Sequence, residues 1–210
     1  MDIFKRIEEE KIVPVIKLEN KESALPLADA LLAGGIGVAE VTFRTDAAAG
    51  AIELLRKERP DMLVGAGTVL NMDQLSAAID AGAQFVVAPG FNPRIVEACL
   101  SQKVPMVPGV NSPSQVEAAM DMGLEILKFF PAELSGGIPM LKTLGSVYPV
   151  KFMPTGGLNE SNMIDYLRLA NVIACGGSWM VKPDFIANGE FETITKLSLA
   201  VREILNRAFK

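Results

Sequence analysis

The chain has 210 residues, half of them hydrophobic, so it is long enough to bury one full core. No shift in composition indicates a second domain, and we expect a single domain over residues 1–210. The net charge of −5 disfavours binding to nucleic acid or to an anionic membrane, because both partners need a concentrated basic surface.

The first ten residues are charged and amphipathic and lack the apolar centre of a signal peptide. No apolar run in the sequence is long enough to span a bilayer. We therefore expect a cytoplasmic protein. The two cysteines, Cys99 and Cys175, lack metal-ligand spacing and lie in apolar surroundings, which indicates that they fill the core.

The sequence contains no histidine. This excludes a Ser-His-Asp triad, a Cys-His dyad and any metal site with histidine ligands. Proton transfer in an enzyme of this composition must then involve carboxylates, lysine, tyrosine, water or the substrate itself. The sequence also has no other cluster with metal-ligand spacing, so we expect no metal.

Short β-type runs recur about every 20 to 25 residues, which is the length of one strand-plus-helix unit in an α/β barrel. The eight candidate strands are 12–16, 37–41, 62–64, 84–88, 104–107, 125–129, 151–153 and 171–175. The helix-like segments between and after them are 23–33, 47–59, 71–81, 93–102, 114–122, 137–146, 160–169 and 191–209. This alternation predicts a parallel sheet, and the apolar strands indicate that both faces of the sheet are covered.

Eight such units favour a closed barrel over an open doubly wound sheet. No GxGxxG follows the first strand, which disfavours dinucleotide binding. The segment before Ile12 is expected to form a short helix over the lower end of the barrel. The predicted fold is therefore an α/β protein made of a single (β/α)8 TIM barrel with an N-terminal helix.

Lys128 lies within the largely apolar segment 124–133, LEILKFFPAE. Burial at this position disfavours the ammonium form, and a neutral amine can attack a carbonyl carbon. The alternative is a lysine at the end of a strand that extends its ammonium group to solvent. This segment alone leaves both interpretations open.

In a barrel of this type, the carboxyl ends of the strands and the loops after them form the active site. Glu40, after the second apolar run, is either a general acid–base or a partner in a salt bridge with Arg44 or Lys128. Arg44 offers a planar fork for a carboxylate, or is a solvated cation. Thr68 and Thr155 either donate hydroxyl hydrogen bonds to a ligand or cap the helices that follow them.

Glycine pairs follow the last two candidate strands, as Gly156-Gly157 and as Gly176-Gly177-Ser178. Barrels of this type often bind phosphate there through backbone N–H groups. A single glycine pair more often marks a turn, but two pairs at these places favour a phosphate site. Lys17, at the end of the first strand, either adds positive potential for an anionic substrate or is a surface lysine.

Together these motifs closely resemble, essentially end to end, the bacterial 2-keto-3-deoxy-6-phosphogluconate aldolases, also known as 4-hydroxy-2-oxoglutarate aldolases. The segments that carry the resemblance are 14–16 (PVI), 40–45 (EVTFRT), 65–70 (GAGTVL), 108–110 (PGV), 128–133 (KFFPAE), 154–157 (PTGG) and 176–179 (GGSW). The resemblance implies a class I aldolase, usually a homotrimer, that needs neither a metal nor an organic cofactor.

By motif match, the resemblance implies that Lys128 is the Schiff-base lysine and Glu40 the acid–base. The implied substrate contacts are Arg44 and Thr68 at the pyruvyl carboxylate with Thr155 nearby, Gly156, Gly157, Gly177 and Ser178 at the phosphate, and Pro89 and Phe130 along the pocket. Ala88 stands where relatives often have serine or threonine, and Lys17 stands at a position that differs among relatives. Both residues bear on fine specificity.

The expected reaction is cleavage of 2-keto-3-deoxy-6-phosphogluconate to pyruvate and D-glyceraldehyde 3-phosphate. We expect activity on 4-hydroxy-2-oxoglutarate as well, which would give pyruvate and glyoxylate. Two alternatives stay open. One is a 2-keto-3-deoxy-6-phosphogalactonate aldolase, and the other is a non-catalytic phosphosugar-binding barrel, because a fold alone does not imply a chemistry.

Overall fold

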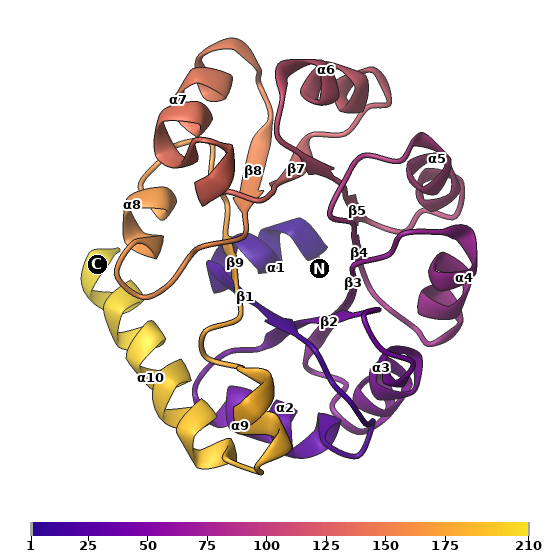
Figure 1. Ribbon diagram of the computed structural model, residues 1–210, viewed down its shortest axis with the longest axis vertical. Helices are drawn as coiled ribbons and strands as arrows, with labels where there is room; N and C mark the ends of the chain where they lie inside the picture. The colour runs from indigo at the N-terminus through magenta and orange to yellow at the C-terminus, as the bar shows by residue number, and fades with distance from the viewer. Residues whose placement is uncertain (1, 210) are drawn as a thin grey trace.

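The computed structural model describes residues 2–209, with parallel strands at the centre and helices around them (Figure 1). The strands are β1 (Ile12–Ile16), β2 (Val38–Thr42), β3 (Leu63–Gly67), β4 (Val86–Val87), β5 (Met106–Val107), β6 (Gly109–Val110), β7 (Ile126–Phe129), β8 (Lys151–Pro154) and β9 (Cys175–Gly177). The helices are α1 (Ile3–Glu10), α2 (Ala24–Ala33), α3 (Ala47–Glu58), α4 (Met72–Asp80), α5 (Pro93–Ser101), α6 (Pro113–Asp121), α7 (Gly137–Val147), α8 (Met163–Leu167), α9 (Pro183–Ala187) and α10 (Phe191–Ala208), with a 3-10 turn η1 (Glu133–Ser135) before α7.

Hydrogen bonds divide the strands into two parallel sheets that together curl around the centre of the molecule (Figure 1). Six strands pair in the order β5-β4-β3-β2-β1-β9, and three pair in the order β6-β7-β8. The chain passes from β5 to β6 through Pro108, which has no N–H to donate. On the other side, the isolated bridges Phe152↔Val172 and Thr155↔Gly176 connect β8 to the segment that contains β9.

The predicted alternation of strands and helices is confirmed. The strands differ from the prediction in their ends and in the additional short strand β6. The candidate strands 84–88 and 104–107 each contain only two residues in strand conformation. The last strand is Cys175–Gly177 rather than 171–175, so its glycines lie inside the strand and not in a loop after it. A Cβ at Gly176 would lie 2.2 Å from Oγ1 of Thr155, which explains why glycine occupies a strand position there.

The helices differ from the prediction in two places. The segment 160–169 contains only the short helix α8, and α9 forms in a region for which the sequence predicts no element. The N-terminal helix α1 is confirmed. It leads directly into β1 at the amino ends of the strands, and Ile7 of this helix is completely buried.

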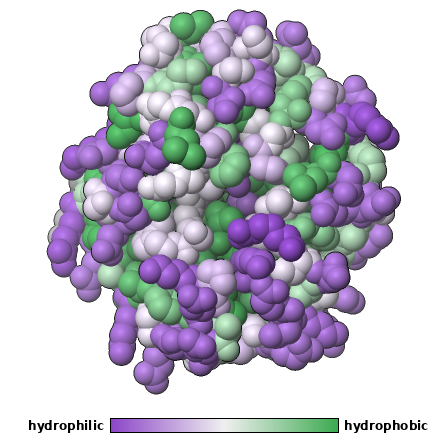
Figure 2. All heavy atoms as spheres, in the orientation of Figure 1, coloured by the Kyte–Doolittle hydropathy of each residue, from purple (hydrophilic) through white to green (hydrophobic). Residues whose placement is uncertain are grey.

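The core is apolar and continuous from the strands to the inner faces of the helices. Phe129 of β7 and Phe152 of β8 pack edge to face, with ring centres 6.4 Å apart. Both cysteines are free and buried, which confirms the prediction that they fill the core. Burial raises the pKa of Cys99 to about 11. Figure 2 shows that hydrophilic residues dominate the rim of one face of the molecule. No helix within residues 2–209 is long and apolar enough to cross a membrane.

Candidate active site

Lys128 and Glu40 meet in the interior of the curled sheet. Nζ of Lys128 donates to Oε1 of Glu40 over 3.1 Å, although β7 and β2 are not neighbours in either sheet. Lys128 is 4% exposed and Glu40 is 0% exposed. The alternative that Lys128 extends to solvent is therefore wrong. The salt bridge considered for Glu40 does form, and its partner is Lys128 rather than Arg44.

The second carboxyl oxygen of Glu40 is buried and unpaired. Within residues 2–209, Oε2 has no hydrogen-bond partner. A buried carboxyl oxygen without a donor is costly for a folded protein, and such exceptions often have a functional reason. Glu40 can thus hold Lys128 with one oxygen while the other remains available to a bound molecule.

Gly67 makes room for the carboxyl group of Glu40. It lies at the end of β3, which pairs with β2 so that Glu40 is opposite Gly65 and Thr42 is opposite Gly67. A Cβ at position 67 would lie 2.3 Å from Oε1 of Glu40, closer than any real contact. The sequence places Gly67 in a loop after the third strand, and only the pairing of β2 with β3 reveals this steric role.

Thr42 is a further residue of the site and is not among those predicted from the sequence. Its hydroxyl donates to the carbonyl of Ile16 over 2.6 Å and accepts a hydrogen bond from Nε of Arg44 over 3.0 Å. Thr42 is completely buried, whereas Arg44 is exposed. The bond restrains one edge of the guanidinium group. A sequence signal for Thr42 does exist, because residues two apart on a strand share a face and Glu40 is two residues before it.

The two candidate hydroxyl donors lie at strand ends and cap no helix. Thr68 follows β3 with a φ of 56°, a value that is rare for a β-branched residue. Thr155 follows β8 and is buried, and its Oγ1 has no hydrogen-bond partner within residues 2–209. The helices that follow have Asn71 and Asn162 at their N-caps. The helix-capping alternative for both threonines is therefore wrong.

The loop after β8 directs its carbonyl groups toward protein donors and leaves N–H groups unused. The carbonyls of Thr155 and Gly156 accept from the backbone N–H groups of Ala132 and Glu133 over 2.8 and 3.1 Å. The Gly157 carbonyl accepts from Asn162 over 3.2 Å. Gly156 and Gly157 have φ values of 100° and 84°, which favour glycine. Among residues 2–209, no acceptor takes the N–H of either glycine.

The other predicted site residues also lie at carboxyl ends of strands. Phe130 follows β7, and its ring centre is 5.6 Å from Nζ of Lys128. Pro89 follows β4 and is half-buried. Gly177 ends β9 against the indole ring of Trp179, and the exposed Ser178 follows it.

Lys17 follows β1 and forms an ion pair with Glu19 at 2.6 Å. Its side chain is 33% exposed. The carboxylate of Glu19 offsets the charge of Lys17, which favours the interpretation of Lys17 as a surface lysine over a source of positive potential.

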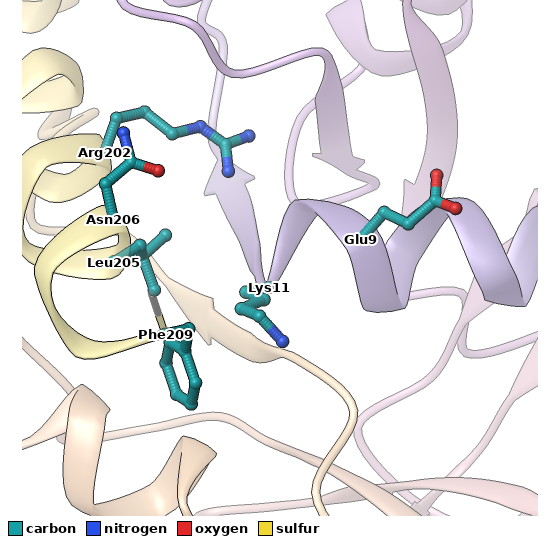
Figure 3. A pocket seen from close by; sticks show the side chains of 6 residues that line it. All are labelled: Glu9, Lys11, Arg202, Leu205, Asn206 and Phe209. Carbon is teal, nitrogen blue, oxygen red and sulfur yellow. The ribbon is translucent and has the colours of Figure 1, made fainter.

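A cavity of about 470 Å³ lies at the opposite ends of the strands, between α10 and the end of α1 (Figure 3). Lys11, which directly precedes β1, and Arg202 of α10 supply its positive charges. Both are already engaged, because Arg202 donates to the carbonyls of Gly35 and Glu10 and the ammonium of Lys11 lies 4.6 Å from the ring centre of Phe209. In barrel folds this end contributes to stability, so the cavity does not compete with Lys128 as a candidate site.

Comparison with known proteins identifies the family. Residues 3–197 match the family model described as KDPG and KHG aldolase. The chain belongs to this family. It is 49% identical over 205 residues to the 2-dehydro-3-deoxy-phosphogluconate aldolase of Haemophilus influenzae. The matched region covers 97% of this chain and 95% of that relative.

Two solved structures of family members are closely similar to the chain. One is the KDPG aldolase of Legionella pneumophila with pyruvate captured at low pH as a covalent carbinolamine intermediate, with a TM-score of 0.92, 44% identity and coverage of 96% of this chain and 98% of that one. The other is the 2-keto-3-deoxy-6-phosphogluconate aldolase of Zymomonas mobilis ZM4 with 3-phosphoglycerate, with a TM-score of 0.87, 41% identity and coverage of 95% and 94%. As a KDPG and KHG aldolase, the chain is a carbon–carbon lyase of class I. The alternative of a non-catalytic barrel is therefore wrong.

The contact between Gly67 and Glu40 predicts a sharp difference between two glycine substitutions in this aldolase. Gly67→Ala should displace the carboxyl group of Glu40, the predicted acid–base, and lower kcat about 10²-fold, because a shift of about 1 Å at a reacting group can cost that much. Gly90→Ala is the matched control, because a Cβ at Gly90 would meet nothing within 4 Å. Steady-state kinetics of aldol cleavage would measure both variants. Normal turnover in Gly67→Ala would contradict the steric role of Gly67.

Proposed function

We propose that the aldolase cleaves 2-keto-3-deoxy-6-phosphogluconate to pyruvate and D-glyceraldehyde 3-phosphate through a Schiff base on Lys128. The observation that carries this proposal is the buried contact between Lys128 and Glu40, with the second oxygen of Glu40 unpaired. The pyruvate carbinolamine in the Legionella relative supports the same chemistry for this chain.

The first steps need a neutral amine and a nearby proton acceptor. Transfer of a proton from Nζ to Glu40 along their 3.1 Å contact leaves Lys128 with a free electron pair. The amine attacks the C2 ketone of the substrate and forms a carbinolamine. Glu40 then returns its proton to the carbinolamine hydroxyl group, which leaves as water. This step restores the carboxylate of Glu40 and gives an iminium ion, which withdraws electrons from C3.

The iminium ion makes the cleavage of the C3–C4 bond possible. Glu40, directly or through a water molecule, accepts the proton of the C4 hydroxyl group, the C3–C4 bond breaks, and the aldehyde leaves. The bonding electrons remain on the enamine of pyruvate. Protonation at C3 and hydrolysis release pyruvate and regenerate the amine, so one carboxyl group near Lys128 carries protons in both directions.

The remaining residues of the site fit the two charged ends of this substrate. Arg44, oriented through Thr42, is proposed to bind the pyruvyl carboxylate together with Thr68, with Thr155 nearby. The unused N–H groups of the loop after β8 are proposed to bind the phosphate at the other end, because successive backbone N–H groups form anion sites. Gly177 and Ser178 complete the proposed phosphate site, and Pro89 and Phe130 line the pocket. The 3-phosphoglycerate in the Zymomonas relative supports a site for a phosphorylated acid.

We also propose activity on 4-hydroxy-2-oxoglutarate, which gives pyruvate and glyoxylate. The family description includes KHG aldolase, and this substrate needs the amine and the carboxylate site but no phosphate site. A 2-keto-3-deoxy-6-phosphogalactonate substrate is the alternative within the same reaction type, because it differs only in configuration at C4.

The proposal extends to the architecture of residues 1–210 as a single closed (β/α)8 barrel. Support comes from the continuous chain between β5 and β6 and from the two bridges that connect β8 with the β9 segment. The family resemblance further implies a cytoplasmic homotrimer. It also implies that no metal or organic cofactor is needed, since the iminium ion itself accepts the electrons.

Borohydride trapping tests the proposed Schiff base directly. Incubation of the enzyme with pyruvate and borohydride should attach one reduced pyruvyl group per chain, and peptide mass mapping should locate it on Lys128. An adduct on Lys17, Lys142 or Lys151 with Lys128 unmodified would overturn the assignment. A comparison of kcat/KM for the phosphogluconate, phosphogalactonate and 4-hydroxy-2-oxoglutarate substrates would then rank them.

A further inference from the structure

Glu133 connects the loop after Lys128 with the loop after β8. It begins the turn η1, and its backbone N–H donates to the Gly156 carbonyl over 3.1 Å. Its aliphatic stem lies directly against Gly157, because a Cβ on Gly157 would be 2.5 Å from Cγ of Glu133. The stem therefore packs against the loop whose unused N–H groups are proposed to bind phosphate.

Tyr166 of α8 holds the carboxyl group of Glu133. The Tyr166 hydroxyl donates to Oε1 of Glu133, and Tyr166 is completely buried. Burial, together with the hydrogen bond to Glu133, raises the pKa of Tyr166, so the phenol remains a donor at neutral pH. A Cβ on Gly137 at the start of α7 would lie 2.9 Å from the Tyr166 oxygen and 3.4 Å from Oε1 of Glu133, so a side chain there would crowd the bonded pair.

The hydrogen bond to Tyr166 fixes where the Glu133 carboxylate points, and this position affects anion binding by the 156–157 loop. The stem of Glu133 faces Gly157, and its carboxylate faces Tyr166. Because the stem lies against Gly157, a carboxylate released from Tyr166 could turn toward the N–H groups of this loop. Because carboxylates bind such N–H groups as phosphates do, a released Glu133 would compete with the substrate for them.

We propose that Glu133 and Tyr166 are positioning residues that hold the 156–157 loop in its phosphate-binding geometry and keep the Glu133 carboxylate out of it. The pair thereby determines the preference of the enzyme for phosphorylated over unphosphorylated 2-keto acids. This inference rests on the proposed function, because it deepens the role of the proposed phosphate site.

Tyr166→Phe tests the inference, since it removes only the hydroxyl group. KM for 2-keto-3-deoxy-6-phosphogluconate should rise about 10-fold with kcat changed less than about twofold, as expected for a lost binding contact. Inhibition by inorganic phosphate should weaken by a similar factor. The kcat/KM for 4-hydroxy-2-oxoglutarate should stay within about twofold of the wild type, because this substrate has no phosphate.

Three further variants separate positioning from a general effect on folding. Glu133→Ala removes the stem that packs against Gly157, at an exposed position, and should raise KM, but by less than Tyr166→Phe does, because no released carboxylate then competes with the phosphate. Glu133→Gln keeps the stem and an oxygen acceptor and should restore a KM near that of the wild type. Tyr148→Phe is the matched control, because Tyr148 also donates to a glutamate, Glu117, over 2.7 Å but on the surface. Tyr148→Phe should change no kinetic constant.

The possible failures can be told apart. Equal losses on both substrates in Tyr166→Phe and Glu133→Ala, with unchanged phosphate inhibition, would show that the pair serves the fold and would overturn this inference. If Tyr166→Phe fails to fold, the kinetic constants of Glu133→Ala and Glu133→Gln decide alone. Failure of the wild-type enzyme to be trapped with pyruvate would instead overturn the proposed function.

Discussion

Replacing Lys128 with methionine is expected to reduce the cleavage of 2-keto-3-deoxy-6-phosphogluconate by at least about 10⁴-fold, because the substitution removes the proposed nucleophile. Borohydride should then trap no pyruvate on the chain. Lys128→Arg should be equally inactive, since a guanidinium group keeps the positive charge but does not form a Schiff base. Appreciable turnover in either folded variant would contradict the assignment of Lys128.

The same substitution carries a prediction for stability. Lys128→Met leaves the Glu40 carboxyl group buried without its partner, which typically costs about 3–5 kcal/mol of the free energy of unfolding. Lys128→Arg keeps a cation near Glu40 and should lose less. Lys142→Met is the control, because Lys142 is exposed on α7 and should affect neither turnover nor stability. Urea unfolding of the three variants would measure these differences.

Replacing Glu40 with glutamine is expected to lower turnover about 10²- to 10⁴-fold, the typical range for loss of a general acid–base. The amide has nearly the same shape, so the variant should fold and keep the carboxylate site that is proposed at Arg44. Exchange of the pyruvate methyl protons with D₂O isolates the proton-transfer step from cleavage, and this exchange should slow with turnover.

Glu125→Gln is the matched control for this experiment, because Glu125 is exposed directly before β7, the strand of Lys128. It should exchange the methyl protons at the wild-type rate. Wild-type exchange in Glu40→Gln would show that another group is the base.

The sequence predicts the candidate site well where a residue type is unusual for its surroundings. A lysine within an apolar run and a glutamate after a second one point to chemistry, and the structure brings both together. Thr42 and Gly67 are less visible. Gly67 acquires its role only because β2 pairs with β3 and brings it against Glu40. The hydroxyl of Thr42 reaches the Ile16 carbonyl only because β1 pairs with β2.

The sequence by itself determined the alternation of strands and helices and the family, because these depend on local patterns and motifs that are read along the chain. It did not determine the ends of short strands such as β9, where the need for space beside Thr155 outweighs the low strand propensity of glycine. Only the tertiary structure decided that Lys128 pairs with Glu40, 88 residues away, and that Tyr166 holds Glu133. Such contacts join residues that are far apart in the sequence and that the fold brings together in space, so no local sequence pattern predicts them.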